Sequence, residues 1–267
     1  SDELVGPRVQ EIEFEVEMAP SGAAGTAPMW GKLLRACQFA ETVTADTRVE
    51  YTPVSDPGES LVLRYWEDGH AYVAKGCRGQ VTIEAEAYKI PVLKFRFEGF
   101  DTQGTASAWG GPASPYAGWQ TPVMPMDTTS GDIKLGCSYT AGALSGGTAY
   151  PSKGLTLDLG NTLTYDAILG GEKVVVTDRQ PKGRMVMELS AAQEAAWRSD
   201  MNAGTETSMG WQLSTGAGRS IVLFIRRLQR QELQGIEENR FRRAEVNFGA
   251  ILDKDDPNDD FMRLCVK

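Results

Sequence analysis

Several segments of this chain alternate apolar and polar residues with a period of two, and this alternation constrains the fold more than any other feature. The clearest segment is Glu-Ile-Glu-Phe-Glu-Val-Glu-Met at residues 11–18, and the pattern recurs at 80–87, 93–98, 185–189 and 244–250. Successive side chains of a strand point to opposite faces, so each segment reads as a strand with one buried face. The sequence therefore predicts a mainly β protein.

Two short helices are expected between the strands. Residues 28–37 open with Pro28, which suits a first helical turn, and Ser190 to Gln193 has the form of a capping box. In each segment a tryptophan precedes an apolar residue by four positions, so the two side chains share a helix face. We expect both helices to pack on the sheet through these faces.

The order of these elements repeats along the chain. In each half an alternating strand leads to a tryptophan-bearing helix, two further strands and a long closing strand region. This order predicts a duplicated domain, since internal repetition of supersecondary units is a fold-level signal. The expected division is a first domain at 1–101, a connecting loop at 102–132 and a second domain at 133–267.

The connecting loop is rich in Gly, Pro, Ser and Thr, yet it carries Trp109, Tyr116 and Trp119. A purely flexible linker would not normally hold this many aromatic residues. The loop is expected either to pack on its own subunit or to contact a neighbouring subunit.

Charge and hydropathy exclude several classes of function. A net charge of −9 argues against general binding to nucleic-acid backbone. The segment 219–243 is richer in Arg than in Glu, and we expect these charges to pair with acidic neighbours on strand faces. No stretch has the roughly 18 uncharged apolar residues of a membrane span, and the first residues do not resemble a signal peptide. We therefore expect a soluble protein with no membrane partner, made in a cytoplasm.

No motif in the sequence predicts catalysis, a cofactor or a metal site. The four cysteines, which form no CxxC pair, are expected to be free and buried: Cys37, Cys77, Cys137 and Cys265. The single histidine, His70, follows the turn-like pair Asp68-Gly69 and is expected to be an ordinary hairpin residue. The acidic segment 253–260 lacks the glycine and glutamate of an EF-hand and is expected to be a solvated turn before a last strand at 261–266.

Five segments of the chain, at 13–43, 49–56, 76–100, 155–183 and 256–267, resemble the tail tube proteins of siphophages, the long-tailed phages with non-contractile tails. The resemblance is strongest to those of transposable phages of Pseudomonas and its relatives, and the first and fourth segments are the most specific. It implies a β-sandwich-like subunit with a flanking helix, and together with the repeated element order this predicts two tandem tail-tube-like β-sandwich or barrel domains, each with one short flanking α-helix. It also implies that the long strands join those of neighbours into a closed barrel, which leaves no sheet edge unpaired.

The resemblance implies a structural virion protein that forms stacked rings around a DNA channel in the phage tail, assembled in the host cytoplasm. Its partners would be its own copies and the tail terminator, tail tip and tape measure proteins. Relatives carry several dozen residues ahead of the segment that matches Glu11, and the repeat agrees, so we expect a further segment before residue 1. Two units per chain predict a trimeric ring with pseudo-sixfold symmetry; the alternative is a ring of six whole chains.

The row Glu11, Glu13, Glu15 and Glu17 places four carboxylates on one face of one strand. One interpretation is an ordinary hydrated sheet face, since like charges at this spacing repel one another. The other is that these residues, with Glu84 and Glu86, line a negative channel along which DNA slides without sticking. A second function class also remains, a β-sandwich module that binds carbohydrate through the aromatic residues of the connecting loop.

Overall fold

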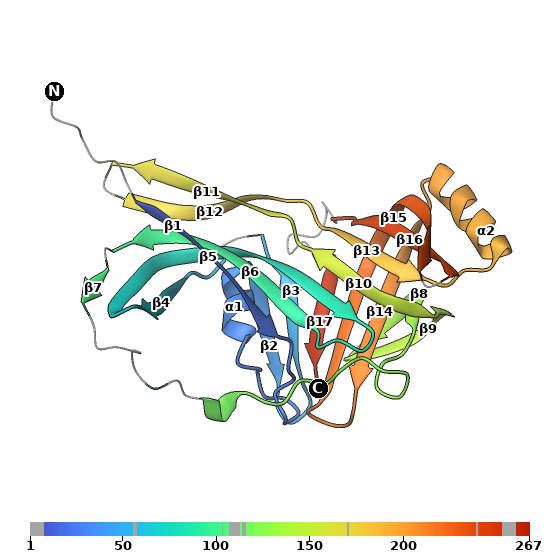
Figure 1. Ribbon diagram of the computed structural model, residues 1–267, viewed down its shortest axis with the longest axis horizontal. Coiled ribbons are helices and arrows are strands. Elements are labelled where there is room, and N and C mark those ends of the chain that lie inside the picture. The colour runs from blue at the N-terminus through green and yellow to red at the C-terminus, as the bar shows by residue number, and fades with distance from the viewer. Residues whose placement is uncertain are drawn as a thin grey trace.

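The computed structural model describes residues 8–55, 58–102, 104–106, 113, 116–169, 171–238, 240–252 and 260–267. Within these residues the protein is mainly β with two α-helices, as the alternation predicts (Figure 1). The expected hairpin at His70 is confirmed, because Glu67 pairs with His70 across the turn of Asp68 and Gly69. The expected turn at 253–259 lies outside the described residues.

The first half contains one helix and seven strands. They are β1 (Val9–Glu17), α1 (Gly31–Ala36), β2 (Phe39–Thr44), β3 (Arg48–Pro53), β4 (Leu61–Glu67), β5 (His70–Glu86), β6 (Val92–Asp101) and β7 (Thr105–Ala106). A 3-10 turn, η1 (Tyr116–Gly118), lies in the connecting loop.

The second half contains the longer helix and ten strands. They are β8 (Ile133–Thr140), β9 (Ala143–Tyr150), β10 (Ser152–Asp158), β11 (Asn161–Ile168), β12 (Gly171–Arg179), β13 (Lys182–Met187), α2 (Ala191–Asn202), β14 (Glu206–Ser214), β15 (Ser220–Glu238), β16 (Phe241–Ala250) and β17 (Met262–Val266).

Strands from both halves join one sheet. Seven of them lie side by side in the order β1-β6-β5-β10-β13-β16-β15, and every adjacent pair is antiparallel. Within this row the pairing order β1-β6-β5 of the first half recurs as β13-β16-β15 in the second, with β10 between the two groups. The first and seventh strands therefore run in the same direction.

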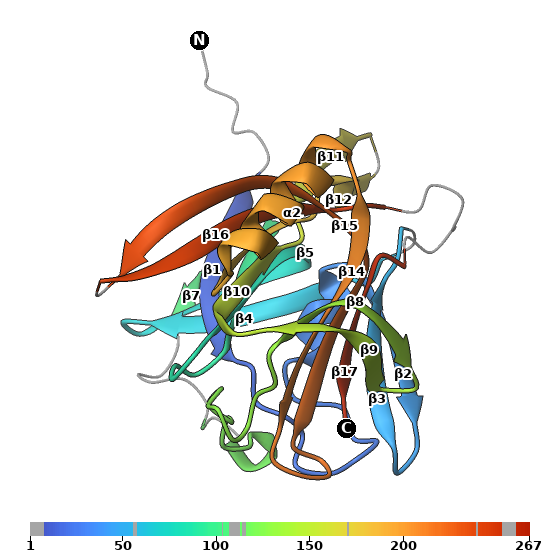
Figure 2. The ribbon, with the colours of Figure 1, turned by 90° about the vertical axis from the view of Figure 1, so that its right-hand side faces the viewer.

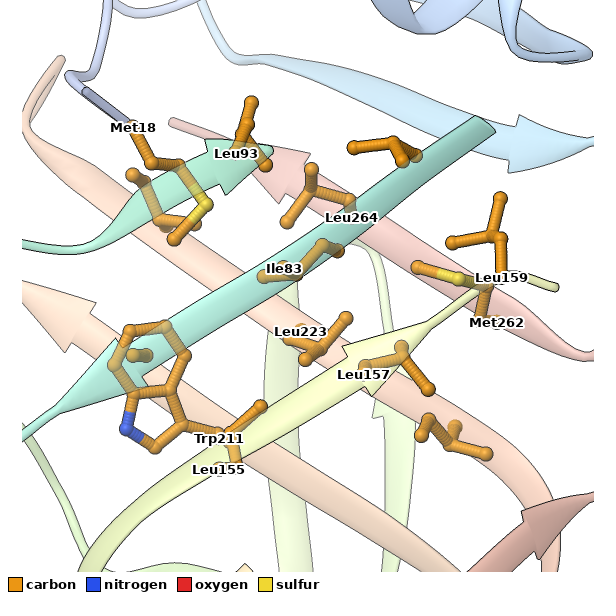
Figure 3. Packing of buried hydrophobic residues seen from close by; sticks show 14 of the residues in the cluster. Met18, Ile83, Leu93, Leu155, Leu157, Leu159, Trp211, Leu223, Met262 and Leu264 are labelled. Carbon is orange, nitrogen blue, oxygen red and sulfur yellow. The ribbon is translucent and has the colours of Figure 1, made fainter. Parts of the chain in front are cut away.

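The two halves also share one core. Buried residues of β5, β6, β10, β15 and β17 pack together beneath the sheet (Figure 3). Ile83, Leu157, Leu223 and Leu264 are fully buried there and come from both halves. Strand β17 at the chain's C-terminal end pairs with β3 of the first half, which ties the halves together again. The structure thus joins the two predicted units into a single body.

Both predicted helices are present. Helix α1 is shorter than the predicted 28–37, and Trp30 stands at its N-cap, where its ring nitrogen donates to the Ala19 carbonyl oxygen at 2.7 Å. Helix α2 has the predicted capping box between Ser190 and Gln193. All four cysteines are free and buried, as expected.

The β11–β12 hairpin is a separate two-stranded sheet that the alternation did not predict. It extends along the upper side of the molecule in Figure 1, above the first half. The β15–β16 hairpin is a second projection, and Figure 2 shows it extending away from the body.

Candidate functional site

The seven-strand row has one face in the core and one polar face toward solvent. Directly paired residues share a face, so the register identifies its members. One line of paired residues crosses all seven strands: Glu17, Val92, Glu84, Thr156, Arg184, Asn247 and Glu232. The next line is Glu15, Lys94, Thr82, Asp158, Lys182, Gly249 and Gln229. The polar face is therefore continuous across both halves of the chain.

The opposite side of the same strands explains why this face is fixed. On β1, Ile12, Phe14 and Val16 are half-buried against the core, and the glutamates between them are exposed. The Phe14 ring lies 5.7 Å from Phe95 and 5.8 Å from Phe97. A slip of one residue would bury the glutamates and expose these side chains, so the register holds the carboxylates outward.

Basic residues on β6 pair with part of the acidic set. Arg96 contacts Glu11 at 2.8 Å and Glu98 at 3.0 Å, and Lys94 contacts Glu84 at 2.8 Å. The hydrogen bond from Arg96 lowers the pKa of the Glu11 carboxyl. The bond to Glu84 raises the pKa of Lys94. Glu11 and Lys94 therefore stay charged near neutral pH, and the pairing of Glu11 with Arg96 removes part of the repulsion along β1.

Three of the β1 carboxylates form no ion pair within the described part of the chain. Glu13, Glu15 and Glu17 are exposed and make no ion pair with any described residue. In the register Glu13 lies directly opposite Arg96, and Glu15 lies opposite Lys94. However, Arg96 donates a hydrogen bond to Glu11, and Lys94 donates one to Glu84. The result is a polar face with an excess of negative charge along its β1 edge.

A comparison with family models decides what kind of protein carries this face. The model described as phage tail tube protein matches residues 1–251, which include all seven strands of the row. The chain belongs to the phage tail tube protein family. No curated protein matches it.

Membership of this family makes the chain a structural component of the phage tail that assembles with its own copies into a tube. Among the described residues, no group of three or more His, Cys, Asp or Glu side chains is arranged to hold a metal ion. The longest helix in the described part of this tail tube protein, α2, has 12 residues, which is too short to cross a membrane.

The sequence-predicted acidic residues all lie on the polar face. Glu11, Glu13, Glu15 and Glu17 line its β1 edge, and Glu84 and Glu86 lie on β5, two strands away. Sequence reasoning missed the residues of the second half that share the face, above all Asp158, Arg184 and Glu245. The alternation along β13 and β16 indicates which way Arg184 and Glu245 point. Only the pairing of β10 with β5 places these two residues, and Asp158 on β10, on the same face as the glutamates.

The predicted contact residues of the connecting loop are placed in part. Tyr116 and Trp119 are exposed, at 76% and 39%, on and beside η1. Trp109 lies outside the described residues. The loop also packs on its own subunit, since the Tyr88 N–H donates to the Pro125 carbonyl oxygen at 2.8 Å and Ser130 bridges to Leu213.

Four of the seven arginines in the segment 219–243 form ion pairs with acidic neighbours, as predicted. Arg226 contacts Asp260 at 2.8 Å, Arg227 contacts Glu206 at 2.7 Å, and Arg230 contacts Asp200 at 2.6 Å. Arg242 contacts Glu194 on α2 at 2.8 Å. The basic run is thus distributed over acidic partners instead of forming a surface for nucleic acid.

Proposed function

We propose that this chain is the major tail tube protein of a long-tailed phage with a non-contractile tail, and that its polar face lines the channel through which DNA is ejected. The observation that carries the proposal is the continuous polar face across seven antiparallel strands. Carboxylates outnumber cations on it, and a negative lining repels phosphates, so DNA passes without binding.

The repeated strand order supports two tail-tube units within the chain, the first in 1–101 and the second in 133–267, joined by the loop 102–132. In each unit three strands pair in the same order and directions, β1-β6-β5 and β13-β16-β15. Strand β10 joins the units by pairing with β5 on one side and β13 on the other. We propose that the contact between chains has the same strand arrangement as this contact inside the chain.

The edges that remain open are suited to a head-to-tail ring. In the described residues β1 pairs only with β6, and residues 232–238 of β15 pair only with β16. In the repeated order, β1 corresponds to β13 and β15 corresponds to β5. Inside the chain, β10 bridges β13 and β5. Because β1 and β15 run in the same direction, a bridging strand in the position of β10 keeps the joined sheet antiparallel. A repeated rotation of this contact closes a ring.

The strand count favours three chains per ring. Three rows of seven strands and the three bridging strands between them give 24 strands. At about 4.8 Å per strand their circumference is about 115 Å, and the diameter is about 37 Å before strand tilt widens it. Barrels of about 16 to 18 strands already enclose an aqueous channel. Six whole chains would double this width if both halves joined the barrel, and the continuous row leaves no separate outer half.

In this proposal the rings stack into a tube in the host cytoplasm and become part of the virion tail. Partners besides the chain's own copies are the tail terminator, tail tip and tape measure proteins. The test is the symmetry of the assembled tube by electron cryomicroscopy, with the mass of isolated rings as an independent measure. We expect three chains per ring and both halves of each chain at the lumen. Six chains per ring, with one half at the lumen, would contradict it.

A further inference from the structure

Two apolar surfaces of the chain lie on opposite sides of the molecule. The first is the tip of the β11–β12 hairpin, where Ile168 is 57% exposed and Leu169 is fully exposed. The second, which we call the apolar band, lies on the connecting loop and the β5–β6 turn. Its exposed members are Tyr88, Ile90, Met124 and Met126.

The band is one surface because the two segments are tied together. The Tyr88 backbone N–H donates to the Pro125 carbonyl oxygen at 2.8 Å, which holds the β5–β6 turn against the loop. Next to this bond lies a hollow of about 240 Å³, lined on one side by Tyr88, Pro125, Met126 and Trp211 and also by the charged residues Glu86, Asp127, Asp132 and Lys153. It has the space of about eight waters, enough to admit an aliphatic side chain from outside.

The hairpin tip and the band face away from each other. In Figure 1 the β11–β12 hairpin runs along the upper side of the molecule and the loop with η1 along the lower side, and Figure 2 shows the same separation after a quarter turn. Exposed apolar clusters on a soluble chain mark contact surfaces. When two clusters that bind each other lie on opposite sides of a subunit, each copy binds the next through the same contact. Repetition of this contact builds an open filament.

The hairpin is held in a fixed direction, so its tip can serve as a contact. At its base, the Arg179 guanidinium donates to the Asn161 side-chain oxygen at 3.0 Å and to the Val54 carbonyl oxygen at 3.0 Å. The Asn161 amide donates to the carbonyl oxygens of Cys37 and Gly79 at 3.0 and 3.1 Å. Further along the hairpin, the Tyr165 ring meets Phe100 edge-on at 5.8 Å. The hairpin is thus fixed to the first half.

We propose that Ile168 and Leu169 of one ring dock on the apolar band of the next ring, so that this contact stacks the rings. The partner is a second copy of this chain, and the inference rests on the proposed ring assembly. Each contact is small, but it recurs around the ring. Once one contact forms, the others become intramolecular, so weak contacts add to a stable stack.

The first test changes the tip without touching the ring interface. In the double variant Ile168→Asp and Leu169→Asp we expect rings of normal mass and a loss of tubes, measured by electron microscopy and sedimentation. The control is Val62→Asp, which changes an apolar side chain on β4 that is about as exposed as Ile168 and lies outside both surfaces. Tubes of normal length from the double variant would overturn the inference. Wild-type protein that forms no rings would instead refute the proposed function.

The second test locates the partner surface by cross-linking. All four natural cysteines are buried, so introduced thiols report new contacts. The pair Leu169→Cys and Met126→Cys should give, on oxidation of assembled tubes, covalent ladders longer than one ring. The pair Leu169→Cys and Val62→Cys should not. Ladders from the control pair only, or cross-links confined within single rings, would overturn the assignment.

Discussion

At the scale of single residues, the most constrained polar group outside the polar face is Arg179. It is 7% exposed, and its guanidinium also contacts the Gln38 side-chain oxygen at 3.2 Å. Gln38 follows α1 with a φ of 65°, a left-handed conformation that non-glycine residues rarely adopt. The hydrogen bonds from Arg179 to Gln38 and Val54 therefore fix an unusual turn of the first half to the base of a hairpin from the second.

We predict that Arg179→Met lowers the free energy of unfolding by about 3 kcal/mol, because it leaves buried oxygens without donors. The measurement is urea unfolding of the unassembled chain. The matched control is Arg184→Met, since Arg184 contacts Glu245 at 3.1 Å from an exposed position. That surface pair should contribute less than about 1 kcal/mol. Equal losses in both variants would contradict the prediction.

At the scale of elements, α2 is the helix whose formation depends most on its own sequence. It lies largely exposed, and Trp197 is its only fully buried side chain in the described structure. The centres of the Trp197 and Tyr150 rings lie 4.9 Å apart. The Arg230 guanidinium carbon lies over the Trp197 ring, 4.6 Å from its centre. With a single anchor in the core, the capping box has to supply much of the order of the first turn.

Replacing Ser190 by Ala removes the side-chain oxygen that accepts from the Gln193 N–H, and we predict a loss of about 1 kcal/mol. Thermal unfolding measures it, together with the loss of helical circular dichroism. Ser138→Ala is the control, because that hydroxyl bonds only on an exposed strand surface. A Ser190 variant no less stable than the Ser138 variant would show that packing of Trp197 alone maintains the helix.

The elements also show how far sequence reasoning reaches. Strands with clear alternation, such as β1 and β6, and the capped helix α2 were predictable because the signal is local. The β11–β12 hairpin was not, since its apolar run Val174 to Val176 shows no alternation. The polar face was predicted only on β1 and β5, because the pairing of β10 with β5 joins residues some 70 positions apart. Such pairing depends on tertiary contacts that no local pattern encodes.

At the scale of the whole molecule, the organising feature is the continuity of one sheet through both halves. A single core beneath it and a single polar face above it mean that neither half is an appendage of the other. In the proposed arrangement of two units per chain, every second seam of the ring is intramolecular. This raises the effective concentration of that seam and lets the two units diverge in sequence.

The charge of the polar face leads to a prediction about DNA passage. In the double variant Glu13→Lys and Glu15→Lys the change falls on exposed side chains that make no ion pair with described residues, so tubes should still assemble. Each of the two substitutions replaces a negative charge by a positive one, so the net charge of each chain at the proposed lumen changes by +4. DNA should be retained, with an affinity that falls steeply as salt rises, because binding releases counterions from phosphates.

The control with the same charge change is Glu59→Lys and Glu67→Lys, two exposed residues before and on β4 that lie outside the seven-strand row and outside both apolar surfaces. Both tubes are then equally changed in net charge, and only the position of the new lysines differs. DNA held in a channel is shielded from nuclease, whereas DNA adsorbed outside is digested. We therefore expect protected DNA in tubes of the Glu13 and Glu15 variant and digested DNA on the control tubes. Equal digestion in both would place the glutamate row on the outer surface and remove the basis for a channel lining.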